Sequence, residues 1–114
     1  MNLTLKQLVN QLNLKPISDD WEDTPVISGY ASDLLSDVLA KGGDGCLWIT
    51  NQKHQNIVGV AVMVNLVAVV ITGGISPDDN TLEKSKEEHI PLFTTDASLF
   101  DVVGKLYELG IRSC

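Results

Sequence analysis

Four hydroxyl residues recur at a constant interval of 22 positions, and each directly follows a short apolar run. They are Ser28, Thr50, Thr72 and Thr94, and the runs before them are 25–27, 46–49, 67–71 and 90–93. Continuous apolar runs predict buried strands, and the helix-length segments between them predict parallel strands joined by crossover helices. The sequence therefore predicts an α/β fold, a single domain with a mainly parallel sheet and crossover helices on both faces.

This repeat also predicts where a ligand would bind. In an open parallel sheet the carboxyl ends of all strands lie at one edge, and such folds bind ligands there. We therefore expect the four hydroxyl residues and the loops that follow them to converge at that edge.

The remaining elements follow from helical spacing and capping signals. A helix near 5–12 is expected after Thr4, whose hydroxyl forms a capping box with Gln7, and a short strand is expected at 14–17. Segment 52–64 would suit a strand as well as a helix, but parallel strands on either side require a crossover, which favours a helix that stops at Asn65. Further helices are predicted from Ser32 to about 40, with Leu34, Leu35, Val38 and Leu39 on its inner face, from Ser76 to about 88, and from Thr95 or Asp96 to Gly110.

Charge and cysteine usage narrow the functional classes. With 114 residues the chain fits one domain, 1–114, and its net charge of −7 argues against nucleic-acid binding and against nonspecific membrane binding. The longest apolar stretch falls short of the ~18 residues that a membrane span needs. Cys46 lies in a predicted buried strand and Cys114 is the last residue. We therefore expect no structural disulfide, and a cytoplasmic protein.

Three segments resemble the DRTGG domain family, and together they cover nearly the whole chain. Residues 70–74 read Val-Ile-Thr-Gly-Gly, residues 90–95 read Ile-Pro-Leu-Phe-Thr-Thr, and residues 29–38 look like the entry of stand-alone bacterial and archaeal members. The resemblance implies an α/β regulatory domain similar to the amino-terminal domain of HPr kinase/phosphorylase. Relatives are inserted between CBS domains of regulated pyrophosphatases or fused to phosphate acetyltransferases. The resemblance thus implies a dimerising, signal-transmitting module rather than a catalyst.

The chain also departs from that family. The Thr-Gly-Gly part of the family's name is present, whereas the preceding Asp-Arg pair is not, and residues 51–56 read Asn-Gln-Lys-His-Gln-Asn instead. A phosphate-binding loop of the Gly-x-x-x-x-Gly-Lys-Ser/Thr type does not occur, so the resemblance does not imply kinase activity.

An anionic ligand is expected at the helix start after Thr50. Helix amino termini attract anions, but Asp33, the Asp78 and Asp79 pair, and Asp96 place carboxylates at the other candidate helices. The predicted site of a small anionic metabolite or nucleotide consists of Thr50, Asn51, Gln52, Lys53, His54, Thr72, Gly73 and Gly74.

Several alternatives stay open. The hydroxyl residues could serve only as helix caps or turn formers, and His54 could be simply exposed, could contact the ligand, or could act in a small enzyme or phosphotransfer accessory. His54 and His89 have no further ligand-type residues at metal spacing, so we expect neither a metal nor a cofactor. A module that binds only a partner protein is the third alternative.

The helix expected at 52–64 predicts a homodimer. Its later turns are apolar on every side, with Ile57, Val58, Val60, Val62 and Met63 among them. One sheet buries only one side of a helix, so a second subunit is expected to cover the other. Such a regulatory domain is also expected to act on a separate partner protein.

Overall fold

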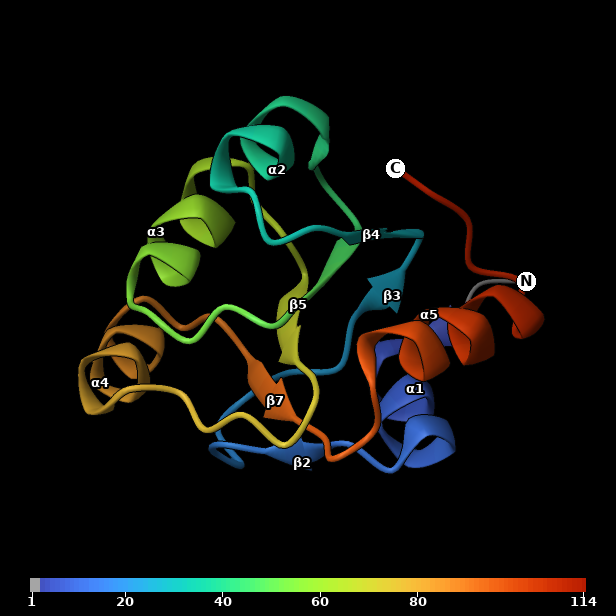
Figure 1. Cartoon of the computed structure of the whole chain (residues 1–114), viewed down its shortest axis with the longest axis horizontal. Helices are drawn as coiled ribbons and strands as arrows, with labels where there is room; N and C mark the ends of the chain where they lie inside the picture. Colours follow the sequence, from blue (N-terminus) through green and yellow to red (C-terminus); the bar gives the residue numbers. More distant parts are fainter. Residues whose placement is uncertain (1–2) are drawn as a thin grey trace.

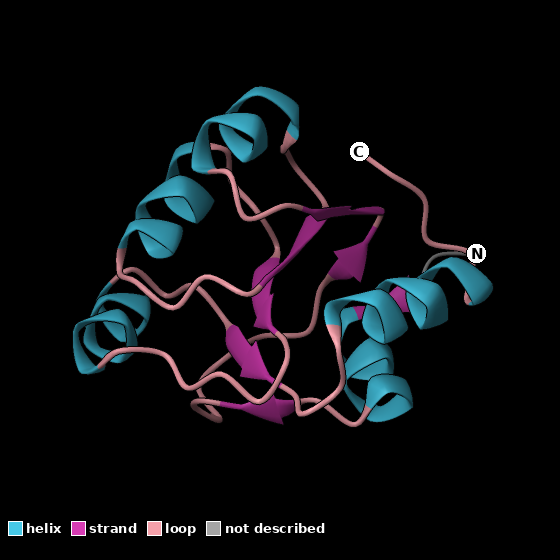
Figure 2. Cartoon of the chain, viewed as in Figure 1, coloured by secondary structure: helices cyan, strands magenta, loops and turns pink. Residues whose placement is uncertain are grey.

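The computed structural model describes residues 3–114, which form three layers. A five-stranded sheet lies in the middle (Figure 1). One face is covered by helices α2 (Leu35–Lys41), α3 (Asn56–Met63) and α4 (Asp79–Glu87). The other face is covered by helices α1 (Leu5–Leu12) and α5 (Leu99–Glu108). Figure 2 shows the same arrangement, with the strands between the two groups of helices. The predicted α/β class with helices on both faces of a mainly parallel sheet is confirmed.

The sheet has the strand order β2-β7-β6-β5-β4. Its core is parallel and consists of β4 (Ser28–Ala31), β5 (Cys46–Thr50), β6 (Ala68–Ile71) and β7 (Leu92–Thr94). The short strand predicted at 14–17 is β2 (Lys15–Pro16), which pairs antiparallel with β7 at one edge. A separate antiparallel pair is formed by β1 (Leu3–Thr4) and β3 (Pro25–Val26).

Alternating strand residues face the two helical layers, and both faces of the sheet are buried. On β5, Leu47 and Ile49 pack with α1 and α5, whereas Cys46 and Trp48 pack with α2 and α3. Each strand residue from Cys46 to Thr50 is buried, which explains why these strands read as continuous apolar runs. The Nε1–H of Trp48 donates to the Ser32 carbonyl oxygen at 2.8 Å, so its one polar group is satisfied.

Helix α1 (Leu5–Leu12) begins as predicted. Thr4 accepts the Gln7 amide and the Gln7 side chain accepts the Thr4 amide, which completes the expected capping box. The caps of three other helices differ from the prediction. Helix α2 (Leu35–Lys41) has no side-chain cap because the Ser32 hydroxyl accepts the Leu34 amide in a turn before the helix.

The predicted cap of α5 and the predicted inner face of α2 are also corrected. Helix α5 (Leu99–Glu108) is capped by Ser98 rather than by Thr95 or Asp96, because the Thr95 hydroxyl accepts the Ala97 amide in the preceding turn. On α2, Val38 is buried as expected, but Leu34 and Leu39 belong to the exposed apolar side chains. Helix α5 ends before Gly110, the predicted stop, which has a φ of 100°.

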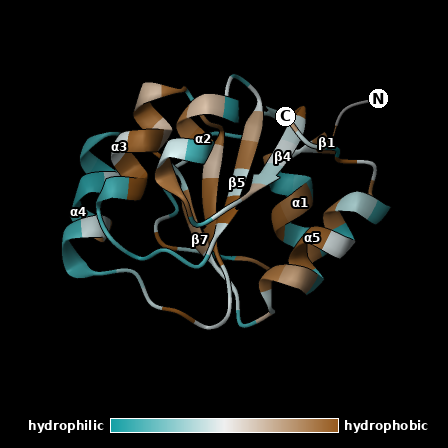
Figure 3. Cartoon of the chain, turned by 45° about the horizontal axis from the view of Figure 1, so that its top comes forward, coloured by the Kyte–Doolittle hydropathy of each residue, from teal (hydrophilic) through white to brown (hydrophobic). Residues whose placement is uncertain are grey.

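Segment 52–64 contains helix α3 (Asn56–Met63), so the choice of helix over strand is confirmed. The helix is shorter than expected, however, and residues 51–55 form a loop before it. Asn65 has a φ of 56° and ends the segment in the left-handed conformation, as predicted. Helix α4 (Asp79–Glu87) begins at its N-cap Asp78, two residues after the expected start at Ser76. Figure 3 shows that α4 is hydrophilic over most of its length.

Ser28 does not lie at the carboxyl edge of the sheet. It begins β4 and pairs in register with Cys46, the first residue of β5, while Ala31 at the end of β4 pairs with Ile49. The apolar run 25–27 is divided between β3 and the turn into β4, so the repeat of 22 residues marks a strand end only at Thr50, Thr72 and Thr94.

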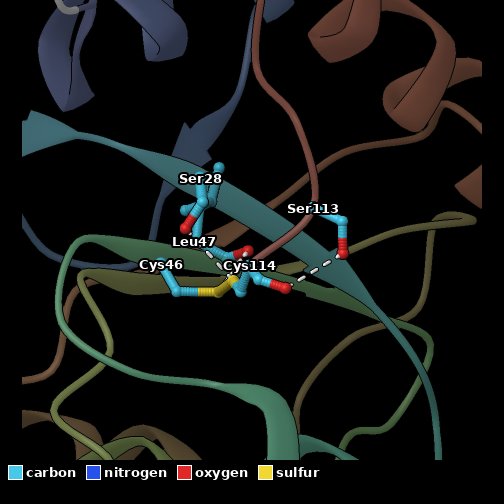
Figure 4. Close-up of a disulfide and its surroundings, with 5 residues drawn as sticks. All are labelled: Ser28, Cys46, Leu47, Ser113 and Cys114. Carbon is cyan, nitrogen blue, oxygen red and sulfur yellow. Dashed lines mark hydrogen bonds between the residues drawn. A yellow bond between two sulfur atoms is a disulfide. The ribbon is translucent and has the colours of Figure 1, made fainter.

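The expectation of no structural disulfide is wrong. Cys46 and Cys114 form a disulfide, and Figure 4 shows Cys114 lying against the start of β4 and β5. Cys46 is buried at the start of β5 as predicted, and the last residues lie against the sheet. They run parallel to β4 and form a bridge between Ser113 and Gly29, which brings the terminal cysteine to the sheet.

No helix within residues 3–114 combines the length and the apolar character needed to cross a bilayer.

Candidate ligand site at the carboxyl edge of the sheet

Three loops meet at the carboxyl edge of the sheet, as the sequence predicted for three of the four strand ends. Thr50 pairs in register with Ile71, and Ile71 pairs with Thr94, so β5, β6 and β7 end side by side. The loops that follow are 51–55, 72–78 and 95–98. The predicted site residues at the end of β5 and in the loops after β5 and β6 are therefore neighbours.

Asp33 organises the first loop, although the sequence analysis assigned it only to a helix start. Its Oδ1 accepts the Thr50 hydroxyl at 2.7 Å and the Asn51 amide at 2.8 Å. Its backbone carbonyl accepts the Gln52 side-chain amide at 2.9 Å. The available signal was the position of Asp33 two residues after the end of β4, at the same edge. The incorrect placement of Ser28 at that edge concealed it.

The hydroxyl groups of Thr50 and Thr72 are buried and form hydrogen bonds within the protein. Thr50 and Thr72 have no exposed surface. The Thr50 hydroxyl donates to Asp33 and accepts the Gln52 amide at 3.1 Å, while the Thr72 hydroxyl donates to the side-chain oxygen of Asn51. These contacts are those expected of turn-forming hydroxyl groups.

The glycine pair after Thr72 forms a left-handed turn. Gly73 and Gly74 have φ values of 74° and 70°, as required for a turn that L-residues adopt with difficulty. The Gly73 amide donates to the Ala97 carbonyl at 2.7 Å and the Gly74 amide donates to the Thr95 carbonyl at 2.9 Å. The turn thus joins the loops after β6 and β7, and both amides are used within the protein.

Lys53 and His54 share one carboxylate, that of Asp78. The His54 Nδ1 lies 2.7 Å from one Asp78 oxygen, and the Lys53 Nζ lies 3.8 Å from the other. An ionised carboxylate only accepts hydrogen bonds, so in this contact the Nδ1 carries the hydrogen. The other ring nitrogen of His54, Nε2, takes no part in the contact with Asp78. The side chains remain accessible, with 50% of Lys53, 62% of His54 and 40% of Asp78 exposed.

The two segments are also joined through their backbones. The Lys53 carbonyl accepts the Asp78 amide at 3.1 Å and the buried Thr81 hydroxyl at 2.7 Å. Because Asp78 is the N-cap residue of α4, the loop that carries the two basic residues is coupled directly to the start of that helix. From the sequence, Asp78 was expected only at the start of a helix, because a contact with residues 53–54 leaves no local pattern.

The start of α3 leaves backbone donors available. Among the hydrogen bonds of residues 3–114, none uses the amides of residues 53–56 as a donor, and Gln55 provides no side-chain cap. No acidic residue lies in the first turn of α3, as predicted. Unpaired amides and the helix dipole together favour an anion at such a terminus.

The chemistry of this edge is that of a polar surface. Among residues 3–114 no group of three or more potential metal-binding side chains occurs.

A cavity of about 640 Å³ lies at the opposite edge of the sheet, before β5, β6 and β7. Trp21, Gly45, Val67 and Pro91 are among the residues that line it. The carboxyl edge is the better candidate for an anion site, because the basic side chains and the unpaired amides lie there.

Comparison with known structures identifies the fold. The chain is similar to a crystal structure of the CBS and DRTGG domains of the regulatory region of Clostridium perfringens pyrophosphatase, complexed with its activator diadenosine tetraphosphate. The TM-score is 0.72 at 15% sequence identity, over 90% of this chain and 45% of that chain. The chain thus spans less than half the length of that regulatory region. Neither the protein-family models nor the curated protein sequences yield a match.

The comparison defines a three-layer α/β domain with a DRTGG-like fold. The resemblance to DRTGG domains that the sequence indicated is confirmed at the level of the fold.

Proposed function

We propose that the chain is a non-catalytic regulatory domain, a single DRTGG-like unit over 1–114, which senses a small anionic metabolite or a nucleotide. The observation that supports this proposal most strongly is the fold shared with a regulatory region that was crystallised with a dinucleotide activator. A role in the cytoplasm and control of a separate partner protein belong to the same proposal.

The proposed binding surface is centred on the loop before α3, with the Thr72-Gly73-Gly74 turn beside it. The amides of residues 53–56 would donate to a phosphate group, and Lys53 and His54 would supply cationic or hydrogen-bonding side chains. Asp78 now occupies both side chains, so a bound phosphate must compete with its carboxylate.

This competition provides a route from the ligand to the rest of the domain. A phosphate that takes Lys53 and His54 from Asp78 removes two contacts from the N-cap residue of α4. Ligand binding would therefore shift the position or stability of the start of α4. A regulatory equilibrium needs such contacts that differ between the free and the bound state.

Calorimetric titration with diadenosine tetraphosphate, ATP and inorganic phosphate tests the proposal. Lys53→Ala should weaken binding by about tenfold to a hundredfold, because one charge-assisted hydrogen bond is worth about 1.5–3 kcal/mol. Asp78→Asn should tighten binding, because it removes the competing charge. Lys86→Ala, which removes an exposed lysine at the far end of α4, is the matched control and should bind as the wild type does.

Two results would contradict the proposal. One is a lack of heat with all three compounds, together with unchanged melting temperatures. The other is equal affinity in Lys53→Ala and the Lys86→Ala control, which would place the anion elsewhere.

A phosphotransfer role for His54 is the second candidate. The 2.7 Å contact with Asp78 orients the imidazole, and the side chain is well exposed. We propose that, in this case, the Nε2 would accept a phosphoryl group from a small phosphodonor. Incubation with acyl and enol phosphates, followed by detection of acid-labile phosphohistidine, distinguishes this role from simple binding, and His54→Ala is the negative control.

We also propose that the chain forms a homodimer through α3. The sheet buries Ile57, Val58 and Ala61, while Val62 and Met63 at the end of the helix are 44% and 75% exposed. A second copy that covers these two side chains would remove that apolar surface from water.

A further inference from the structure

The C-terminal residues act as an added strand at the free edge of the sheet. The Gly29 amide donates to the Arg112 carbonyl at 2.9 Å, and the Cys114 amide donates to the Gly29 carbonyl at 3.1 Å. Strand β4 is the last strand of the sheet on this side. Residues 112–114 therefore satisfy both backbone groups of Gly29, which would otherwise lie unpaired at an edge.

The disulfide fastens this added strand to the interior of the sheet. Cys114 reaches across the start of β4 to Cys46 on β5, and the Ser28 hydroxyl donates to the Cys114 sulfur at 3.2 Å (Figure 4). Beside this contact lies an apolar groove of about 260 Å³ between β4 and α5. Its walls include Tyr30, Leu106 and Ser113, so the C-terminal segment forms part of the groove.

The two cysteine residues differ in their exposure to solvent. Cys46 is 1% exposed and packs in the core with Trp48, whereas Cys114 is an exposed residue at the surface. An external thiolate must approach along the axis of the disulfide and can reach only the exposed partner. Attack is therefore directed to the Cys114 sulfur.

We propose that the Cys46–Cys114 disulfide is a thiol–disulfide exchange site that latches the C-terminal strand to the edge of β4. A dithiol reductant attacks the Cys114 sulfur, the bond to Cys46 breaks, and the Cys46 sulfur leaves with the electron pair and takes up a proton. The second thiol of the reductant then displaces Cys114 as a thiol, so the protein gains two hydrogens and the reductant becomes a disulfide.

Reduction should open this edge locally. Without the disulfide, residues 113–114 are held by the backbone hydrogen bonds to Gly29 and by the contact with the Ser28 hydroxyl. Arg112 keeps a hydrogen bond to the Tyr107 carbonyl at 2.8 Å and stacks on the Tyr107 ring, and both contacts lie at the surface. Ile111, which is buried, keeps the chain before them anchored. The released segment exposes Gly29 and widens the groove beside Tyr30, whereas the core of the sheet keeps its pairing.

Hydrogen exchange of the whole chain, with and without a dithiol reductant, tests the latch. Reduction in native buffer should release two thiols and lower the protection of the Gly29 and Cys114 amides by about tenfold or more, while the amides of β6 keep theirs. Cys114→Ser should show the exchange of the reduced protein in both conditions. The substitution changes only an exposed residue and leaves the buried core in place, so the fold is retained.

Three outcomes would overturn the latch. The disulfide could be absent from the purified oxidised protein. Reduction could leave the Gly29 and Cys114 amides as protected as before. Thiols could appear only as fast as the β6 amides exchange, which would show that the bond opens by global unfolding rather than by attack at the surface.

Discussion

Substitution of the two turn glycines should destabilise the protein without a steric clash. Gly73 and Gly74 both have positive φ, and an added Cβ would lie 3.6 Å from the Asn51 side-chain oxygen and 3.5 Å from that of Asp96, respectively. These are ordinary contact distances. The cost of Gly73→Ala or Gly74→Ala is therefore the cost of a left-handed conformation for an L-residue, about 1–2 kcal/mol for each.

Thermal unfolding measures this cost. At roughly 4 °C per kcal/mol for a domain of this size, each alanine should lower the melting temperature by about 4–8 °C. Gly73→Asn should lose less than Gly73→Ala, because asparagine tolerates the left-handed region better. This second substitution separates backbone conformation from the mere presence of a side chain.

A glycine in a helix provides the matched control with the opposite sign. Gly104 lies within α5, is exposed, and has nothing within 4 Å of an added Cβ. Gly104→Ala should stabilise the protein by about 0.5–1 kcal/mol, because alanine loses less backbone entropy in a helix. If Gly73→Ala and Gly74→Ala melt at or above the wild-type temperature while Gly104→Ala behaves as stated, the argument from left-handed strain is refuted.

Three further predictions concern other contacts. Asp33→Ala removes the acceptor of the buried Thr50 hydroxyl and should cost about 1–3 kcal/mol in chemical denaturation, and a wild-type midpoint would contradict the role assigned to this carboxylate. The pKa of Tyr30 is raised above the ordinary value of 10.0, because its hydroxyl donates to Asp37, is partly desolvated and lies near that negative charge. Absorbance titration should show this pKa falling toward 10.0 in Asp37→Asn. The Tyr30–Asp37 hydrogen bond that raises this pKa contributes its full stabilisation of the fold below pH 10.0, the pKa of the unfolded chain. This stabilisation is lost as the pH rises through the pKa of the folded protein. Met63→Glu should convert the proposed dimer to a monomer in light scattering, and a wild-type protein that is monomeric at micromolar concentration would rule the dimer out.

The fold was predictable because its main signals are local. Buried strands on a doubly covered sheet give continuous apolar runs, and Thr4, Asn65 and Gly110 mark helix ends through contacts within a few residues. Ser28 misled the register because β3 and β4 are separated by a single residue, so the apolar run before it belongs to a different sheet. Residue spacing alone does not show such a change of sheet.

The contacts that shape the candidate site join residues far apart in the sequence. Asp78 meets His54 only because α4 starts beside the loop before α3, and Asp33 meets Thr50 only because β4 and β5 end together. The pairing of Cys46 with Cys114 has the same origin, because it depends on the C-terminal residues lying along β4. Local patterns identified the loop with Lys53 but not the carboxylate that faces it.

The placement of the N-terminal segment has a consequence for how the chain folds. Lys15 of β2 pairs with Thr94 of β7, and Leu5, Leu8 and Leu12 of α1 share a core with Val102 and Leu106 of α5. During synthesis on the ribosome, the first helix therefore emerges long before the residues that bury its apolar face. Its docking joins residues from opposite ends of the sequence, and such nonlocal contacts form slowly. We expect the parallel core from β4 to β7 to assemble first, with α1 docking as a late step that leaves its leucines exposed to chaperones until then.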